Sequence, residues 1–232
     1  AFEHVSFAYP GAKENVLEDI SFVAKTGQTT AIIGGTGSGK TTLVNLIPRF
    51  FDVTKGKVMV DGTDIREMSQ ESLREAIGYV PQKGVLFSGT IDSNLRYGKE
   101  DATKEQVMDA ACIAQAKEII DGKKDGLDSA IAQGGSNVSG GQKQRFSIAR
   151  AIVKDPKIYI FDDSFSALDY KTDAILRREL SKKTKEAAVI IVAQRISTIL
   201  HAEQIIVLNE GKVAGIGTHQ ELFDHCAVYR EI

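Results

Sequence analysis

Apolar and polar residues alternate along this chain in two distinct ways. Residues 16–24 alternate apolar with polar side chains, which is typical of a strand with one buried face. The stretches 30–33, 158–161 and 187–193 are largely apolar throughout, which indicates strands that are buried on both faces. Helix-like segments separate these strands. The pattern therefore predicts an α/β fold built around a parallel sheet.

Shorter signals add hairpins and helices to this fold. The segments 57–65 and 205–215 each predict a β-hairpin, because two short apolar runs flank a turn that ends in glycine. A strand at 77–80 is stopped by Pro81. Helices are expected over residues 42–47, 69–76, 103–120, 142–153 and 173–183.

The stretch from 83 to 153 differs from its flanks because helical patterns fill most of it. Thr103 and Gln106 form a capping box that opens a helix running to about Ile120. We therefore expect a helical subdomain of residues 83–153, inserted into an α/β core that residues 1–82 and 154–232 form.

The most specific motif is a glycine-rich loop between the predicted strand 30–33 and the helix that follows. Residues 34–41 fit G-x-x-x-x-G-K-[ST], whose glycines let successive backbone N–H groups face one phosphate. Lys40 is expected to reach the β- and γ-phosphates, and the Thr41 hydroxyl to ligate Mg²⁺. The expected nucleotide-binding residues are Gly34, Gly35, Thr36, Gly37, Ser38, Gly39, Lys40, Thr41 and Thr42.

Two adjacent carboxylates end the apolar strand at 158–161. A nucleotide hydrolase needs such a group to hold Mg²⁺, the role expected of Asp162, and another to orient water, the role expected of Asp163. The alternative for Asp163 is a solvated charge at a strand end.

A second candidate anion site precedes the predicted helix 142–153. Ser139 can cap this helix, and Gly140 and Gly141 expose backbone N–H groups at its start. One nucleotide needs only one such cradle, so a second indicates that two chains share their nucleotides. The alternative is a simple helix cap.

Composition narrows the function further. The chain has 232 residues and a net charge of −2, which disfavours a large nucleic-acid footprint, and we expect no nucleic-acid partner. Its longest apolar run, 187–193, is too short to span a bilayer. Cys112 and Cys226 lack metal-binding or redox spacing, so we expect free thiols in a cytoplasmic protein.

Three motifs in this order resemble the nucleotide-binding domain of an ATP-binding-cassette (ABC) transporter. They are the loop 34–41, the segment Ser139-Gly140-Gly141-Gln142 and the segment 160–163. The resemblance covers nearly the whole chain. It implies a P-loop NTPase (RecA-like) core with a parallel sheet, an antiparallel β subdomain and an inserted α-helical subdomain. ATP and Mg²⁺ are the implied cofactors.

The resemblance also assigns roles to single residues. Tyr9, in Phe7-Ala8-Tyr9-Pro10, corresponds to the aromatic residue that stacks on adenine, although a core or turn tyrosine is the alternative. Gln82, in Val80-Pro81-Gln82, would touch Mg²⁺ or the attacking water, and Phe87–Ile91 resembles the exporter branch near its membrane-domain contacts. The signature residues for a partner's nucleotide are Ser139, Gly140, Gly141 and Gln142, and the loop that contacts the opposite subunit is Ser166, Ala167, Leu168 and Asp169.

The sequence departs from the family pattern at three places. Where the family has a catalytic glutamate, this chain has Asp163. Its side chain is one methylene shorter, so its carboxylate falls short of the glutamate position by about 1.5 Å. The expected switch histidine is Gln194, which cannot carry a proton charge near neutral pH. Exporters of the family usually carry a Glu-Arg pair shortly before the signature, and this chain has Gln133-Gly134 there.

These departures predict an impaired hydrolytic half beside an intact signature. The expected protein is the ATPase motor of an exporter that dimerises head to tail, at the cytoplasmic face of the cell membrane. Its partners would be a transmembrane domain, expected on the same polypeptide, and a second nucleotide-binding domain. We favour a heterodimer, in which the second nucleotide-binding domain belongs to a different subunit. A homodimer that hydrolyses ATP slowly at two impaired sites is the alternative. A regulatory ATP-binding module and a soluble ABC protein of translation or DNA repair are the competing hypotheses.

Overall fold

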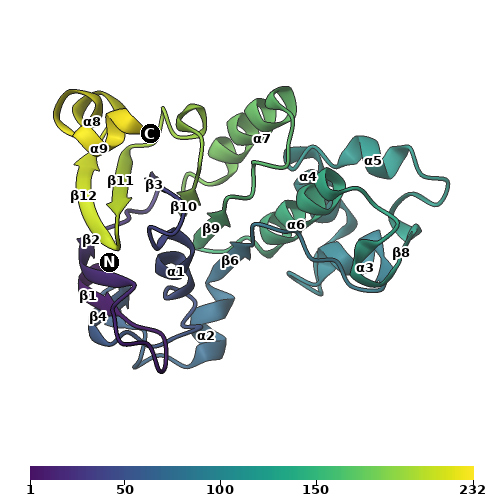
Figure 1. Cartoon of the computed structure of the whole chain (residues 1–232). Coiled ribbons are helices and arrows are strands. Elements are labelled where there is room, and N and C mark those ends of the chain that lie inside the picture. The colour runs from purple at the N-terminus through teal and green to yellow at the C-terminus, as the bar shows by residue number, and fades with distance from the viewer. The chain divides into compact units, whose positions relative to one another are not determined.

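The structure is a computed structural model that describes all 232 residues of the chain. Two compact units divide it: the first comprises Ala1–Ile77 with Ala187–Ile232, and the second comprises Gly78–Glu186. Figure 1 labels the elements of each. The expected division into a core and a subdomain at residues 83–153 stays a prediction.

A sheet with parallel strands forms the centre of the first unit. Strand β3 (Thr29–Gly34) lies between β10 (Ala188–Val192) and β11 (Gln204–Asn209) and is parallel to both. Strand β12 (Lys212–Gly217) completes the predicted hairpin antiparallel to β11. Every residue of β10 is buried, as its continuous apolar run indicates. The predicted parallel strands are thus confirmed.

An antiparallel sheet forms the rest of the β-structure in this unit. Its strand order is β2-β1-β4-β5. The bounds are Phe2–Phe7 for β1, Leu17–Phe22 for β2, Lys55–Val60 for β4 and Thr63–Asp64 for β5. This sheet confirms the expected antiparallel subdomain and the hairpin at 57–65.

Strand β1 was not expected from the sequence. Its register against β2 shifts between Phe2 and Val5 and again between Val5 and Phe7. His4, between the first two, has a φ of 47°, in the left-handed region. The irregularity breaks the two-residue period by which a strand is recognised.

Short helices accompany the sheets of the first unit. Helix α1 (Lys40–Asn45) follows β3, and α2 (Gln70–Glu75) lies within the predicted helix 69–76, with Ser69 as its N-cap. Helices α8 (His219–His225) and α9 (Ala227–Glu231) contact β12 and β11 and were not predicted. A 3₁₀ turn follows β10 at Ile196–Thr198.

The second unit combines two neighbouring strands with a group of helices (Figure 1). The strands are β6 (Ile77–Val80), which begins at the last residue of the first unit's N-terminal segment, and β9 (Ile158–Asp162). Helix α6 (Gly140–Lys154) packs against α3 and α4. The remaining elements are β7 (Gly89–Thr90), α3 (Ile91–Arg96), α4 (Lys104–Ile113), α5 (Lys117–Asp121), β8 (Ala130–Ile131), α7 (Tyr170–Lys183) and the 3₁₀ turns Gly126–Asp128 and Gln133–Gly135.

The expected single helix over 103–120 is two helices, α4 and α5. The backbone turns at Gln115, whose φ of 55° lies in the left-handed region. The N–H of Ala116 then donates to the Ala111 carbonyl at 2.7 Å, which closes the first helix with a Schellman-type cap. The apolar period runs through this break without a glycine or proline, so no local pattern signals it.

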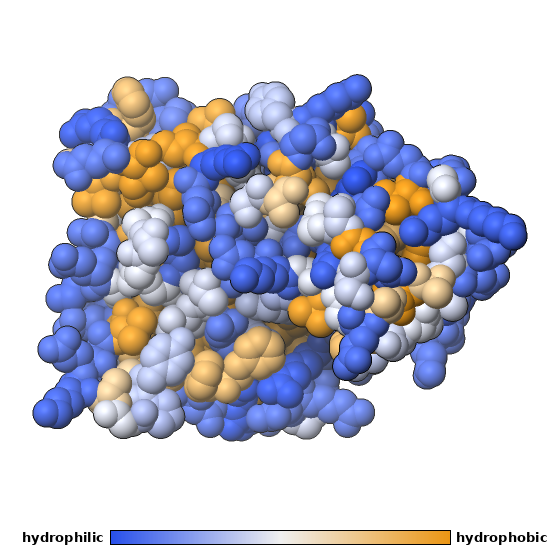
Figure 2. All heavy atoms as spheres, turned by 45° about the vertical axis from the view of Figure 1, so that its right-hand side comes forward, coloured by the Kyte–Doolittle hydropathy of each residue, from blue (hydrophilic) through white to orange (hydrophobic).

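The face shown in Figure 2 is mostly hydrophilic, and polar side chains separate its apolar patches. None of the helices is both long enough and apolar enough to cross a membrane.

Candidate nucleotide-binding and hydrolysis site

The phosphate loop of residues 34–41 joins β3 to α1 in the predicted strand–loop–helix order. Gly37 has a φ of 81°, and Gly39, the N-cap of α1, has a φ of 99°. A Cβ on Gly39 would lie 2.7 Å from Cδ2 of Leu17. The backbone conformation therefore requires glycine at 39, and the close approach of Leu17 leaves little room for a side chain.

The polar groups of this loop suit a phosphate chain. The Lys40 ammonium donates to the carbonyls of Gly34 at 2.6 Å and Gly35 at 2.8 Å, so the cation lies over the loop. The Ser38 hydroxyl is buried and has no hydrogen-bond partner. A Cβ on Gly35 or Gly37 would meet no atom within 4 Å. A cation, an unsatisfied hydroxyl and open space above the glycines are what a phosphate group requires.

Tyr9 is anchored to the helix that follows this loop. Its hydroxyl lies 3.0 Å from Oγ1 of Thr42, the third residue of α1. Its ring meets Phe7 and Phe51 edge to face, with interplanar angles of 79° and 88°. Neither neighbour stacks face to face on Tyr9.

Gln194 leaves the sheet at the same edge as the phosphate loop. Val192, the last residue of β10, pairs with Ile32 of β3, and the N–H of Ala193 donates to the Ile32 carbonyl at 3.1 Å. Gln194 comes next and is exposed. Because β3 and β10 are parallel, Gly34 and Gln194 both lie at the carboxyl ends of their strands.

In the second unit, Gln82 and Asp163 are joined by a side-chain hydrogen bond. Nε2 of Gln82 donates to Oδ2 of Asp163 at 2.9 Å. Asp163 is only 7% exposed and has a φ of 47°, in the left-handed region that aspartate tolerates better than most residues. The next residue, Ser164, donates from its hydroxyl to the Val80 carbonyl at 2.8 Å. The structure thus joins two residues that the sequence assigned to hydrolysis separately.

Asp162 is buried at the end of β9, where Tyr79 of β6 accompanies it. The Tyr79 hydroxyl donates to Oδ2 of Asp162 at 3.4 Å. Burial, and then the Asp162 charge, raises the pKa of Tyr79, so this phenol stays protonated and remains a donor. No group of three or more His, Cys, Asp or Glu side chains forms a protein-only metal cage.

The signature residues open α6 as a reciprocal cap. Oγ of Ser139 accepts from the N–H of Gln142 at 3.3 Å, and Oε1 of Gln142 accepts from the N–H of Ser139 at 3.1 Å. The predicted cap is confirmed, and the helix begins at Gly140, two residues before the expected start. A Cβ on Gly140 would meet no atom within 4 Å. The exposed backbone at this helix start therefore has open space in front of it.

The loop after Asp163 uses its polar side chains in two ways. The Ser166 hydroxyl donates to the Asp163 carbonyl at 2.9 Å, and Asp169 caps α7 by accepting from the N–H of Thr172 at 3.0 Å. That bond lowers the pKa of Asp169. Leu168 is buried, whereas Ser166, Ala167 and Asp169 are exposed. Those three side chains are thus accessible at the surface.

Sequence reasoning missed Tyr79 and Gln144 as neighbours of this chemistry. Gln144 lies on the buried side of α6 and bonds to the loop that carries Gln82. A long polar side chain on a mostly apolar helix face was the available signal.

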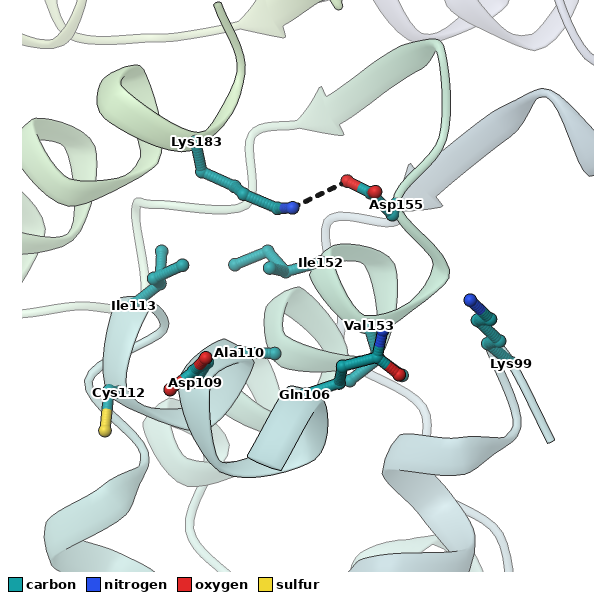
Figure 3. Close-up of a pocket in the computed structure, with 10 residues that line it drawn as sticks. All are labelled: Lys99, Gln106, Asp109, Ala110, Cys112, Ile113, Ile152, Val153, Asp155 and Lys183. Carbon is teal, nitrogen blue, oxygen red and sulfur yellow. Dashed lines mark ion pairs between the residues drawn. The ribbon is translucent and has the colours of Figure 1, made fainter. Parts of the chain in front are cut away.

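A separate hollow of about 340 Å³ lies among α4, α7, the end of α6 and Lys99 in the second unit (Figure 3). Ile113 and Ile152 line its apolar part, and Lys183 forms an ion pair with Asp155 at 2.8 Å across its rim. No residue assigned to nucleotide chemistry lines it.

Comparison with known proteins gives a consistent result. The family model described as ABC transporter matches residues 17–166. An uncharacterised ABC transporter ATP-binding protein of Mycobacterium tuberculosis (strain ATCC 25618 / H37Rv) is 50% identical over 97% of this chain and 39% of its own length. A Bacillus subtilis (strain 168) protein provisionally named multidrug export ATP-binding/permease protein YgaD is 44% identical over 100% of this chain and 40% of its own.

A solved structure agrees with these relatives. A bacterial Atm1-family ABC exporter with ATP bound superposes with a TM-score of 0.95, at 37% identity over 99% of this chain and 40% of that chain. The chain thus spans about two-fifths of the length of these proteins. The fold is the P-loop ATPase fold of ABC proteins, and the chain belongs to the ABC transporter family.

Proposed function

We propose that this chain is the ATP-binding and ATP-hydrolysing motor domain of an ABC exporter. The observation that carries the proposal is the phosphate loop, where Lys40 lies over the glycine carbonyls and Gly37 and Gly39 adopt positive φ. The names of similar proteins support it, since one is an exporter with ATP bound and another is named for multidrug export.

In this proposal each residue has a distinct task. Tyr9 stacks on the adenine, and residues 34–42 hold the phosphates with Lys40 as their cation. Mg²⁺ prefers oxygen ligands and keeps several from phosphate and water, so one carboxylate suffices. When Mg²⁺ is bound, Asp162, Thr41 and Gln82 would be the residues whose oxygens hold it.

The chain's own hydrolytic residues predict slow turnover. Asp163 is one methylene shorter than glutamate, and a misplacement near 1 Å can cost roughly 10²-fold in rate. Gln194 can hydrogen-bond a γ-phosphate, but it cannot take a proton charge near neutral pH.

An intact signature beside these residues supports a heterodimer. In a head-to-tail dimer, Ser139 to Gln142 and the exposed residues of the loop 166–169 face the partner's nucleotide. A partner with glutamate and histidine would then hydrolyse ATP at the site that this chain completes. Both domains would work at the cytoplasmic face of the membrane, attached to transmembrane domains.

A second candidate is a module that binds ATP and regulates without turnover. Asp163 and Gln194 favour it for the chain's own site, because they stand where the family pattern has a longer carboxylate to orient water and a histidine that can carry a proton charge.

Titration with a fluorescent ATP analogue tests the binding site. Lys40→Ala should remove most of the affinity, because it deletes the cation that pairs with phosphate. Tyr9→Ala should weaken binding by about 1–2 kcal/mol if adenine stacks there. Lys25→Ala, at an exposed lysine of the same unit, is the matched control and should bind as the unchanged chain does. Equal affinity in all four proteins would overturn the assignment.

A further inference from the structure

A buried glutamine of α6, Gln144, forms hydrogen bonds to the loop that carries Gln82. Gln144 is 1% exposed. Its Oε1 accepts from the N–H of Gly84 at 2.8 Å, and its Nε2 donates to the Pro81 carbonyl at 3.1 Å. The two hydrogen bonds hold the loop at Pro81 and Gly84, one on each side of Gln82.

The loop also lies directly against the helix. A Cβ on Gly84 would come within 2.8 Å of the Lys143 carbonyl oxygen and of Oγ of Ser147, both on α6. Only glycine fits at that distance without moving the loop. Gln144 therefore acts on a segment that has little room to shift.

An amide side chain suits this position. Gln144 must accept from one backbone group and donate to another at the same time, which neither a carboxylate nor a hydrocarbon side chain can do. Because the side chain is buried, the loss of either bond would leave a backbone group without its partner and favour a different loop conformation.

We propose that Gln144 is a positioning residue for hydrolysis: by clamping Pro81 and Gly84 it aims Gln82 at Asp163. The inference rests on the proposed ATPase function, and it adds a residue that touches neither nucleotide nor metal. Gln82 reaches Asp163 at 2.9 Å only while its loop keeps this conformation.

Kinetics of ATP hydrolysis by the chain provide the first test. Gln144→Met keeps the length of the side chain and removes both hydrogen bonds, and Gly84→Ala lifts the same loop by steric contact instead. Each should lower kcat about 10- to 100-fold, the range expected for a group misplaced by about 1 Å. KM for ATP should change less than about twofold, because neither substitution removes a contact that binds ATP in the ground state.

Ser147→Ala is the matched control. It lies on the same helix, is also buried, and its hydroxyl has no hydrogen-bond partner. Its kcat should therefore stay at the unchanged value. An equal loss in Ser147→Ala would show that any change in this part of α6 impairs the enzyme, and would overturn the specific role of Gln144.

A double-mutant cycle separates positioning from general destabilisation. If Gln144 acts through Gln82, then Gln144→Met should cost little more in a Gln82→Ala background. Losses that multiply independently would overturn the proposal. ATP affinity of each variant, measured by titration, confirms that the protein remains folded.

Amide hydrogen exchange at Gly84 tests the clamp without catalysis. Exchange should be about tenfold or more faster in Gln144→Met and unchanged in Ser147→Ala, since only the former loses the acceptor. If no variant hydrolyses ATP, the proposed function fails while this measurement still decides on the clamp. Unchanged exchange at Gly84 in Gln144→Met would refute it.

Discussion

Gln82 donates a hydrogen bond from Nε2 to Oδ2 of Asp163 at 2.9 Å, across 81 residues of sequence. The bond connects the loop after β6 with the residue after β9. Asp163 is buried and its backbone is left-handed. Removing the amide therefore bears on both the stability and the chemistry of this corner of the second unit.

We expect Gln82→Ala to lower the free energy of unfolding by about 1 kcal/mol, because a hydrogen bond to a buried carboxylate is lost. Urea denaturation measures this. Lys83→Ala, at the next residue, which is also exposed, is the control and should stay within about 0.5 kcal/mol of the parent. Equal unfolding midpoints for the two variants would mean that the bond contributes no stability.

The break between α4 and α5 predicts a stabilising change. Gln115→Gly should raise the free energy of unfolding by about 0.5–1 kcal/mol, because glycine adopts a φ of 55° without the cost that a Cβ imposes. Ala114→Gly should instead destabilise by about 1 kcal/mol, since Ala114 has a φ of −74° near the helical value. Thermal unfolding of both variants shows whether the signs are opposite, and a shared sign would contradict the assignment of Gln115 as the turning point.

Restoring the family residues should speed hydrolysis. Asp163→Glu with Gln194→His returns the longer carboxylate and the titratable ring, and we expect a higher kcat in phosphate-release assays, provided the domain dimerises. Asp163→Glu should also lower stability by up to about 1 kcal/mol, because glutamate tolerates the left-handed backbone less well than aspartate. A parent turnover already within about 1–10³ s⁻¹ would show that the two substitutions do not impair the site.

The heterodimer predicts an asymmetry between two substitutions. In the pair reconstituted with its partner subunit, Ser139→Arg should abolish most ATPase activity, because the larger side chain fills the space in front of Gly140. Asp163→Asn should have a much smaller effect, since turnover occurs at the other nucleotide. Steady-state ATPase rates decide the matter, and a larger loss in Asp163→Asn would favour the homodimer.

The phosphate loop, the Ser139 cap and the buried strands were predictable from the sequence because each is a local requirement. Glycines stand where the loop needs positive φ, Ser139 and Gln142 are three residues apart as a capping box demands, and β10 is apolar throughout because both its faces are covered. Physical constraints of this kind act between neighbours in the chain, so consecutive residues record them.

The rest depended on contacts between residues far apart in sequence. Tyr9 meets Thr42 across 33 residues, Gln144 meets Pro81 across 63, and Gln82 meets Asp163 across 81. The turn at Gln115 and the irregular strand β1 also left no local signature, since the apolar period runs through the turn and is broken within the strand. The sequence by itself determined which groups of the phosphate loop and the signature are present. Only the tertiary structure decided which polar side chains bond to one another, because a hydrogen bond depends on distance in space and not on separation along the chain.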